Sequence, residues 1–292
     1  MRRQPAGSRS RVPVPRGLAY GAEMQVLVSV DIEGVAGVVD SDETHPGRPE
    51  YEWARRLMAA EANAAVGGIL SARPEALVTV ADGHGTYRNL LPELIDRRAR
   101  LVRGKPRPLA MMEGVDQGVD AALFIGYHGR AGSGPSVLAH TFCDGIADVR
   151  LNGVSVGEIG LNAVLAGHFG VPVLLVTGDE SVRVEVAELL PGTAAVVVKR
   201  PIGFAAADSL SPEEARRLIG EAAAEAVARS DAVAPFVVET PVEVEIDLAS
   251  PATLDRVATV PGLTLEQRET FVYRADDALE AFRVVRTVAA LA

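Results

Sequence analysis

The sequence lacks the features of several common classes of protein. It has a single cysteine, Cys143, which excludes an intramolecular disulfide and a zinc site built from several cysteines. It also has no apolar run of about 18 residues, the length that a membrane-spanning helix needs. Basic residues are in the minority, since 29 lysines and arginines stand against 39 acidic residues and give a net charge of −10. We therefore expect no membrane partner and no nucleic-acid partner, because anionic lipid and phosphate would both be repelled.

The rest of the composition is typical of a folded protein. Hydrophobic residues make up 48% and charged residues 23% of the 292 positions, so the chain can bury a substantial core. The length fits one large domain, or one large domain with a smaller one. Disorder is excluded for most of the chain.

The first 23 residues differ from the remainder. They carry five arginines and three prolines, and they lack the hydrophobic stretch of a secretory signal. Met24 stands directly before the first convincing strand. We expect residues 1–23 to be a disordered or spurious extension, with Met24 rather than Met1 as the biological start, and we expect the protein in the cytoplasm.

Beyond this extension, apolar runs typical of buried strands alternate with segments typical of helices. Strands are expected at 24–30, 76–81, 121–126, 171–177 and 194–198. Helices are expected at 51–71, 157–170, 179–190 and 211–230, the last of them opened by a serine cap and a proline. This alternation predicts an α/β fold with a mostly parallel sheet flanked by helices.

The pattern changes beyond residue 235. Residues 237–246 alternate like a half-exposed strand, although Pro241 favours an edge position or a break. A short strand is expected at 270–274 and a final helix at 275–291. We therefore divide the chain into an α/β domain at 24–205 and a smaller C-terminal α+β lobe at 206–292.

The positions of several individual side chains follow from these segments. In the helix at 51–71, Trp53 and Ile69 fall near the spacing of one apolar face, and Glu61 lies elsewhere on the surface. Lys199 and Arg200, at the end of the fifth strand, would either reach a substrate carboxylate or line a solvated edge. We favour the solvated edge.

Polar side chains gather where the predicted strands end. Asp31 and Glu33 follow the first strand, and because they are two residues apart both carboxylates project to one side of an extended chain. His84 follows the second strand and His128 the third. In open α/β sheets, ligands bind at the carboxyl ends of strands. Carboxylates and imidazoles suit zinc and similar divalent ions, so the pattern favours a metal site over four unrelated structural residues.

Three further residues are less specific candidates. Glu158 begins a predicted helix, where it would add a metal ligand or interact with the helix dipole. His140, which lies 12 residues after His128, would be a ligand, a general acid–base or a surface residue. Asp82 would be a ligand or a hydrogen-bond partner of a ligating imidazole.

The other histidines are interpreted as structural or surface residues, and the cysteine as structural. His45 and His168 have no acidic neighbours in such a pattern. Cys143 lies three residues after His140, but a lone cysteine is usually a small buried hydrophobic residue. The glycine-rich segment at 129–135 matches neither a Walker loop nor a dinucleotide motif, so we expect it to be a flexible substrate loop.

Taken in order, these motifs resemble those of the DppA-type D-aminopeptidase family of zinc metallopeptidases. The resemblance is carried by SVDIEGVAG at 29–37, DGH at 82–84, FIGYH at 124–128, His140 and GEIGLNA at 157–163. It extends to EAN at 61–63, MEG at 112–114, VPV at 171–173 and GDE at 178–180, and it fades after about residue 235. This sequence departs from the family's pattern in two small ways. The segment between His128 and His140 is about one residue longer than in the family, and Ala81 replaces a polar residue before Asp82.

The resemblance implies a hydrolase with two zinc ions per subunit that releases N-terminal D-amino acids, of the D-alanine type, from short peptides. The residues at 24–205 would then form the catalytic domain. His140 would correspond to the family's catalytic histidine, described as a nucleophile, and Asp31 would bridge both ions. The implied zinc ligands are Asp31, Glu33, His84, His128 and Glu158. The resemblance also implies a homo-oligomeric decameric ring with the sites facing an inner channel.

Several alternatives stay open. His140 would equally serve by donating a proton to the leaving amine or by stabilising the oxyanion. Another metal-dependent amidase or esterase would share the same site. A non-enzymatic ligand-binding α/β protein would use the same residues as caps and hydrogen-bond partners, and a purely structural ring-forming protein would need none of them for chemistry.

Overall fold

The structure is a computed structural model, and it describes residues 23–267 and 269–292. The predicted extension at 1–23 therefore lies outside the described residues, except for residue 23. Within the described ranges, no helix is both long enough and apolar enough to cross a membrane.

A seven-stranded sheet forms the centre of the molecule, with the order β3-β2-β1-β4-β7-β8-β9. All neighbouring strands run parallel except β8 and β9. The chain fills one side of β1 with β2 and β3 and then crosses to the other side with β4, so a topological switch point lies between β1 and β4. The strands are β1 (Gln25–Val30), β2 (Leu77–Asp82), β3 (Arg100–Val102), β4 (Ala121–Tyr127), β7 (Val173–Asp179), β8 (Ala194–Gly203) and β9 (Ala206–Ser209).

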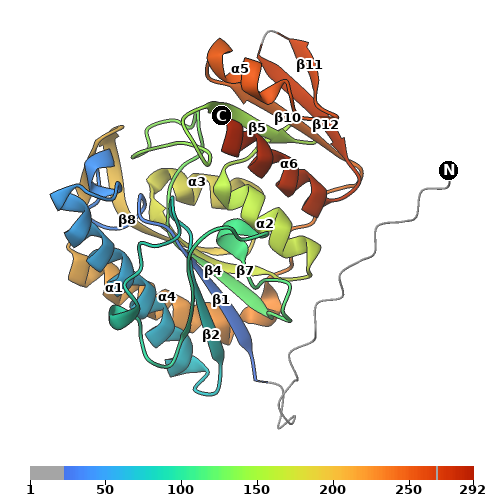
Figure 1. Cartoon of the computed structure of the whole chain (residues 1–292). Coiled ribbons are helices and arrows are strands. Elements are labelled where there is room, and N and C mark those ends of the chain that lie inside the picture. The colour runs from blue at the N-terminus through green and yellow to red at the C-terminus, as the bar shows by residue number, and fades with distance from the viewer. Residues whose placement is uncertain (1–22, 268) are drawn as a thin grey trace.

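Helices cover both faces of this sheet, which confirms the predicted α/β class (Figure 1). α1 (Pro49–Ala72) and α4 (Pro212–Ala228) lie side by side on one face and share a hydrophobic core with it. α2 (Glu158–His168) and α3 (Glu180–Leu189) belong to the core on the other face. The Ser211 side chain accepts a hydrogen bond from Glu214 N, and Asp179 caps α3 in the same way. Single 3₁₀ turns occur at Ser41–Glu43, Pro92–Leu94, Ala110–Met112 and Ser230–Ala232.

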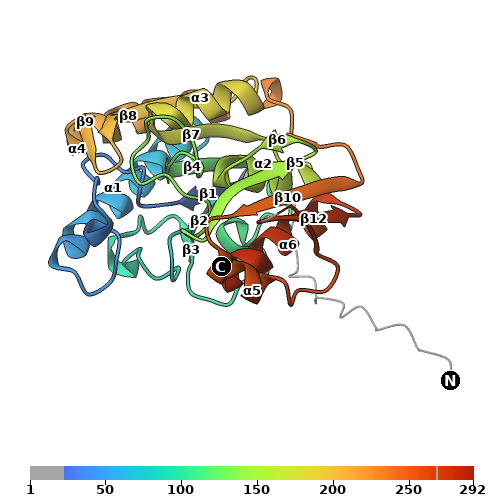
Figure 2. The same cartoon turned by 90° about the horizontal axis from the view of Figure 1, so that it is seen from above.

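A second, antiparallel sheet lies beside the first, with the order β11-β12-β10-β5-β6 (Figures 1 and 2). Its strands come from two distant parts of the chain. They are β5 (Ile146–Leu151) and β6 (Val154–Ser155) from the middle, and β10 (Val242–Leu248), β11 (Thr264–Gln267) and β12 (Thr270–Ala275) from the end. α5 (Pro251–Val257) follows β10, and α6 (Ala278–Leu291) contacts both this sheet and α2.

The predicted division at residues 205 and 206 remains a prediction, but two contacts cross it. α4, which follows the division, packs on α1. β5, which precedes it, pairs with β10. The predicted strand at 237–246 begins only at Val242, directly after Pro241, because proline has no N–H to donate to a neighbouring strand.

Three side-chain placements expected from the sequence are wrong. Trp53 is 40% exposed, whereas Glu61 is only 2% exposed and accepts a hydrogen bond from Ala36 N at 2.9 Å. α1 is covered by α4 as well as by the sheet, so its buried residues occupy more than one face. Lys199 does not line a solvated edge, because it is 2% exposed and its ammonium donates to carbonyl oxygens of Glu33, Val35 and Val38.

Candidate metal centre

The carboxyl ends of β1, β2 and β4 bring the predicted strand-end residues to one edge of the large sheet. Asp31 and Glu33 follow β1, His84 follows β2 and His128 follows β4. The loop after β1 lies directly against β4, since a Cβ added to Gly34 would stand 1.8 Å from the Tyr127 carbonyl oxygen. Only glycine allows this approach.

The first group of side chains consists of Asp31, Glu33 and His84. His84 Nδ1 lies 2.9 Å from Glu33 Oε1 and 3.3 Å from Asp31 Oδ1. Both carboxylates are buried, with exposed fractions of 4% for Glu33 and 2% for Asp31. The three side chains thus face one small volume at the end of β1.

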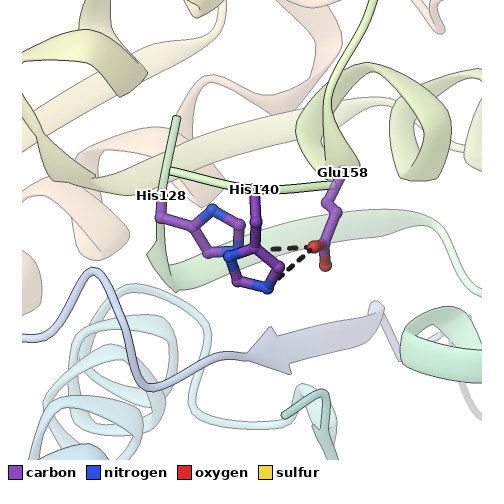
Figure 3. A group of neighbouring side chains, drawn as sticks. All are labelled: His128, His140 and Glu158. Carbon is purple, nitrogen blue, oxygen red and sulfur yellow. Dashed lines mark ion pairs between the residues drawn. The ribbon is translucent and has the colours of Figure 1, made fainter. Parts of the chain in front are cut away.

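The second group consists of His128, His140 and Glu158 (Figure 3). Glu158 Oε1 lies 3.4 Å from His128 Nε2 and 3.7 Å from His140 Nε2. The two imidazole rings stack with their centroids 4.1 Å apart. Glu158 is the first residue of α2, so the start of this helix delivers its carboxylate to the strand ends.

Asp31 connects the two groups. Its Oδ1 faces His84, and its Oδ2 lies 3.5 Å from His128 Nε2. One carboxylate therefore presents an oxygen to each group. The structure brings together all six residues that the sequence singles out as zinc ligands or as the catalytic histidine.

Backbone carbonyls hold the outer nitrogen of each imidazole. His84 donates from Nε2 to Thr44 O at 2.9 Å, His128 from Nδ1 to Gly129 O at 3.0 Å, and His140 from Nδ1 to Leu138 O at 2.9 Å. This pattern turns Nδ1 of His84 and Nε2 of the other two toward the carboxylates, as in metal sites where the second ring nitrogen is fixed by a hydrogen bond.

These residues fit a divalent cation such as zinc. His128 Nε2 is buried and has no hydrogen-bond partner among the described residues, although it faces two carboxylates. A buried polar atom without a partner is costly, and a cation between the groups would satisfy it. The carboxylate and imidazole donors also match the ligand preferences of zinc.

The charges of the site also favour positive charge between the carboxylates, whether it is carried by protons or by a metal ion. Burial raises the pKa of Asp31, but the imidazoles of His128 and His84 outweigh it and hold that pKa well below 3.8. Burial lowers the pKa of His128, but Glu158 and Asp31 raise it well above 6.5. The pKa of His84 is raised in the same way by Glu33 and Asp31. Without a metal, protons on the imidazoles compensate the buried carboxylates.

A cavity of about 620 Å³ opens onto both groups, a volume typical of small-molecule sites. Asp31, Glu33, His84, His140 and Glu158 line it. Residues that sequence reasoning did not single out also line it, and they include Thr44, Tyr87, Lys105, Phe142, Phe204 and Arg286. No local motif marks these residues, because they come from loops and from the distant helix α6.

Asp82 does not contact the ligand imidazoles. Its carboxylate accepts hydrogen bonds from the Asn89 and Leu90 backbone and from the Asn89 side chain, which also donates to His84 O. Asp82 therefore fixes the loop that carries His84, and Asn89 links it to the candidate centre by hydrogen bonds.

Of the residues interpreted as structural or surface positions, two line the cavity and one lies on the surface. Cys143 lines the cavity, and burial raises the pKa of its thiol, which disfavours a reactive thiolate. His45 also lines the cavity, with Nδ1 donating to Ser41 O at 2.7 Å. His168 is exposed at the end of α2 and packs edge-on against Phe169.

Comparisons with known proteins agree with this arrangement. The sequence model of the D-aminopeptidase family matches residues 24–287. A D-aminopeptidase of Bacillus subtilis (strain 168) is 35% identical over 271 residues, which cover 92% of this chain and 98% of the relative. A solved structure described as the zinc-dependent D-aminopeptidase DppA from Bacillus subtilis, a self-compartmentalizing protease, superposes with a TM-score of 0.89 at 33% identity, covering 92% of this chain and 97% of that chain. The chain described here therefore belongs to the D-aminopeptidase family.

Proposed function

We propose that this chain is a zinc-dependent aminopeptidase that releases N-terminal D-amino acids, of the D-alanine type, from short peptides. The observation that carries the proposal is the pair of carboxylate–imidazole groups joined by Asp31 beside a cavity. Family membership and the zinc-dependent relative support the substrate class and the metal. The cytoplasmic location expected from the sequence stays a prediction.

Two zinc ions per subunit are proposed, with Asp31 shared between them. Glu33 and His84 would complete one site, and His128 and Glu158 the other. When bound, a pair of divalent ions polarises a scissile carbonyl and lowers the pKa of water toward neutrality. The buried carboxylates supply the negative charge that would balance such ions. The hydrogen bonds to backbone carbonyls fix the imidazole tautomers, so that the free ring nitrogens face the carboxylates.

His140 is proposed as the catalytic histidine. Its side chain is 23% exposed and lines the cavity, whereas the His128 ring beside it is buried. Because Nδ1 donates to Leu138 O, Nε2 is the atom that can exchange a proton with a substrate. Nε2 could then protonate the leaving amine. It also lies near Glu158, so a ligand role for His140 is the competing assignment.

We further propose that the chain assembles into a homo-oligomeric ring, with a decamer as the expected size. The relative described as a self-compartmentalizing protease supports assembly. Ile202 and Phe204, near the turn between β8 and β9, are 74% and 62% exposed, and exposed apolar side chains of this size favour burial against another protein.

The function is tested with a panel of small peptides. Purified protein, with and without a chelator, is incubated with D-Ala-D-Ala, L-Ala-L-Ala and N-acetyl-D-Ala-D-Ala, and bound zinc is counted by elemental analysis. We expect about two zinc ions per chain and chelator-sensitive cleavage of the first peptide alone. D-Alaninamide and D-alanine methyl ester are assayed in parallel, and cleavage of either of them but of none of the peptides would instead support an amidase or esterase. Absence of zinc and of all turnover would support a binding protein.

A further inference from the structure

Three basic side chains surround Tyr87 beside the candidate metal centre. Lys105 Nζ and the Arg107 guanidinium lie 5.0 Å and 4.0 Å from the centre of the Tyr87 ring, and Arg286 donates to the Tyr87 hydroxyl at 3.2 Å. Lys105 and Arg286 line the cavity. Arg107 instead donates to the carbonyl oxygens of Val102 and Asp82.

In the described part of the chain these charges have no carboxylate in direct contact, although Asp82 and Glu113 lie near enough to Arg107 to oppose the lowering of its pKa by burial. Among the described residues, no carboxylate forms an ion pair with Lys105, Arg107 or Arg286. Asp144 also lines the cavity but makes no such pair. Burial, Arg286 and Arg107 together lower the pKa of Lys105, as expected where like charges stand close without an anion.

Short contacts connect this basic wall to both groups of the candidate centre. The Phe142 ring lies 4.4 Å from the Arg286 guanidinium, and Phe142 N donates to Glu158 Oε1 at 2.8 Å. Tyr87 N donates to His84 O at 2.7 Å. One aromatic residue therefore separates Arg286 from each group, so both ends of a short peptide fit within the one cavity of about 620 Å³ that these residues line.

We propose that Lys105 and Arg286 bind the C-terminal carboxylate of a di- or tripeptide whose N-terminus lies at the candidate metal centre. The proposal rests on the proposed peptidase function and names the part of the site that limits substrate length. A guanidinium and an ammonium ion both donate charge-assisted hydrogen bonds to a carboxylate. The Phe142 ring beneath Arg286 holds the guanidinium in place, since flat stacking on aromatic faces suits arginine.

The first measurement compares peptides that differ only at the C-terminus. We determine kcat/KM of the zinc-loaded protein for D-Ala-D-Ala and for D-Ala-D-alaninamide. The free acid should be preferred by on the order of 10- to 100-fold, because the lost interaction involves charged groups. Arg286→Met and Lys105→Met should each reduce this preference, and Arg286→Lys should retain part of it. Equal rates for acid and amide in the wild-type protein would overturn the proposal.

A binding measurement separates this proposal from the proposed function. The ligands are D-Ala-D-Ala analogues in which a methylene-amino group replaces the peptide bond, one with a carboxylate and one with a carboxamide terminus. Titration calorimetry of the zinc-loaded protein should show tighter binding of the carboxylate, and Arg286→Met should remove the difference. If this holds while no D-peptide is cleaved, the carboxylate site stands and the peptidase function falls. Equal binding of both analogues rejects the carboxylate site whatever the turnover.

The matched control is Arg283→Met. Arg283 lies one turn away on α6 and is exposed, and it is not part of the cavity wall. Its replacement removes the same charge from the same helix and should leave the acid preference unchanged. Loss of preference in both arginine variants would show a general charge effect and contradict the assignment. Lys105 is exposed on a loop, so Lys105→Met keeps the test valid if Arg286→Met fails to fold.

Discussion

Protons and metal ions compete for the same nitrogen atoms in the candidate centre. The pKa values of His84 and His128 are raised above 6.5, so their charged forms stabilise the metal-free fold fully below about pH 6.5 and this stabilisation is lost as pH rises through the raised values. The pKa values of Asp31 and Glu158 are lowered, so their contribution is lost only as pH falls through values below 3.8 and 4.5 respectively.

Zinc should therefore stabilise the protein more at alkaline than at acidic pH. At about pH 6 the cation must displace protons from the imidazoles, whereas toward about pH 9 a growing fraction of the imidazoles has lost its proton and leaves the buried carboxylates unpaired. The check is the rise in Tm on adding zinc to chelator-treated protein across this range. A zinc-induced rise that does not change with pH would contradict the arrangement of ligands described here.

The two possible roles of His140 predict different losses. If it acts on the substrate, His140→Ala should lower kcat by about 100-fold or more while zinc content stays unchanged. If it is a ligand of the second group, zinc content should fall together with activity. Activity and zinc per chain are measured on one preparation. Full activity with full zinc would exclude both roles.

Lys199 should position the loop that carries Glu33. Its three carbonyl contacts would be left unsatisfied in Lys199→Met, which should lower the free energy of unfolding by about 2–4 kcal/mol. We also expect weaker zinc binding, since Glu33 O is one of those contacts. Denaturant unfolding and zinc titration measure the two effects. Arg200→Met, at the exposed neighbouring residue, should change neither.

The site residues that follow the ends of parallel strands could be predicted from the sequence. Asp31, His84 and His128 were predictable because parallel strands deliver their carboxyl-end residues to one edge. The burial of the Glu61 and Lys199 side chains was not predictable. Their partners are backbone atoms of the loop at 33–38, and the spacing of residues in the sequence does not indicate such contacts. A local sequence pattern indicates the periodicity of one helix or strand, but it does not indicate which other parts of the chain pack on that element.

At the scale of elements, the contact between α1 and α4 depends on Gly68. A Cβ at this position would lie 2.1 Å from the Gly220 carbonyl oxygen, whereas nothing lies within 4 Å of a Cβ at Gly67. Gly68→Ala should force the helices apart and lower the free energy of unfolding by about 2 kcal/mol. Gly67→Ala should raise it by about 0.5–1 kcal/mol, because alanine favours helix interiors.

Thermal and denaturant unfolding of the two variants, which introduce the same methyl group one residue apart, measure this difference. Equal changes in stability would show that close contact between the helices does not determine the effect of a substitution at residue 68.

The helices themselves were predictable from caps and periodicity, since Ser211 and Asp179 mark the starts of two of them. The pairing of β5 with β10 was not, because no short-range pattern indicates which distant strands meet.

At the scale of the whole molecule, the proposed ring should be visible in the native mass. Light scattering after size-exclusion chromatography should give a multiple of the 30.7 kDa chain. Ile202→Asp, which places a charge on an exposed apolar position of β8, should reduce that mass. Val237→Asp, at a site 70% exposed outside the strands, serves as the control. A monomer in the wild-type protein would exclude the assembly.

The pairing of β5 with β10 also means that β5 is synthesised well before the strand that it pairs with. Arg150 on β5 binds Asp247 on β10, 97 residues later in the chain. At roughly 5–20 residues per second, a ribosome needs about 5–20 s to supply that partner. Until then the middle strand leaves the ribosome with one edge unpaired. Chaperones that shield such edges should therefore matter most for the yield of this chain in the interval between the two strands.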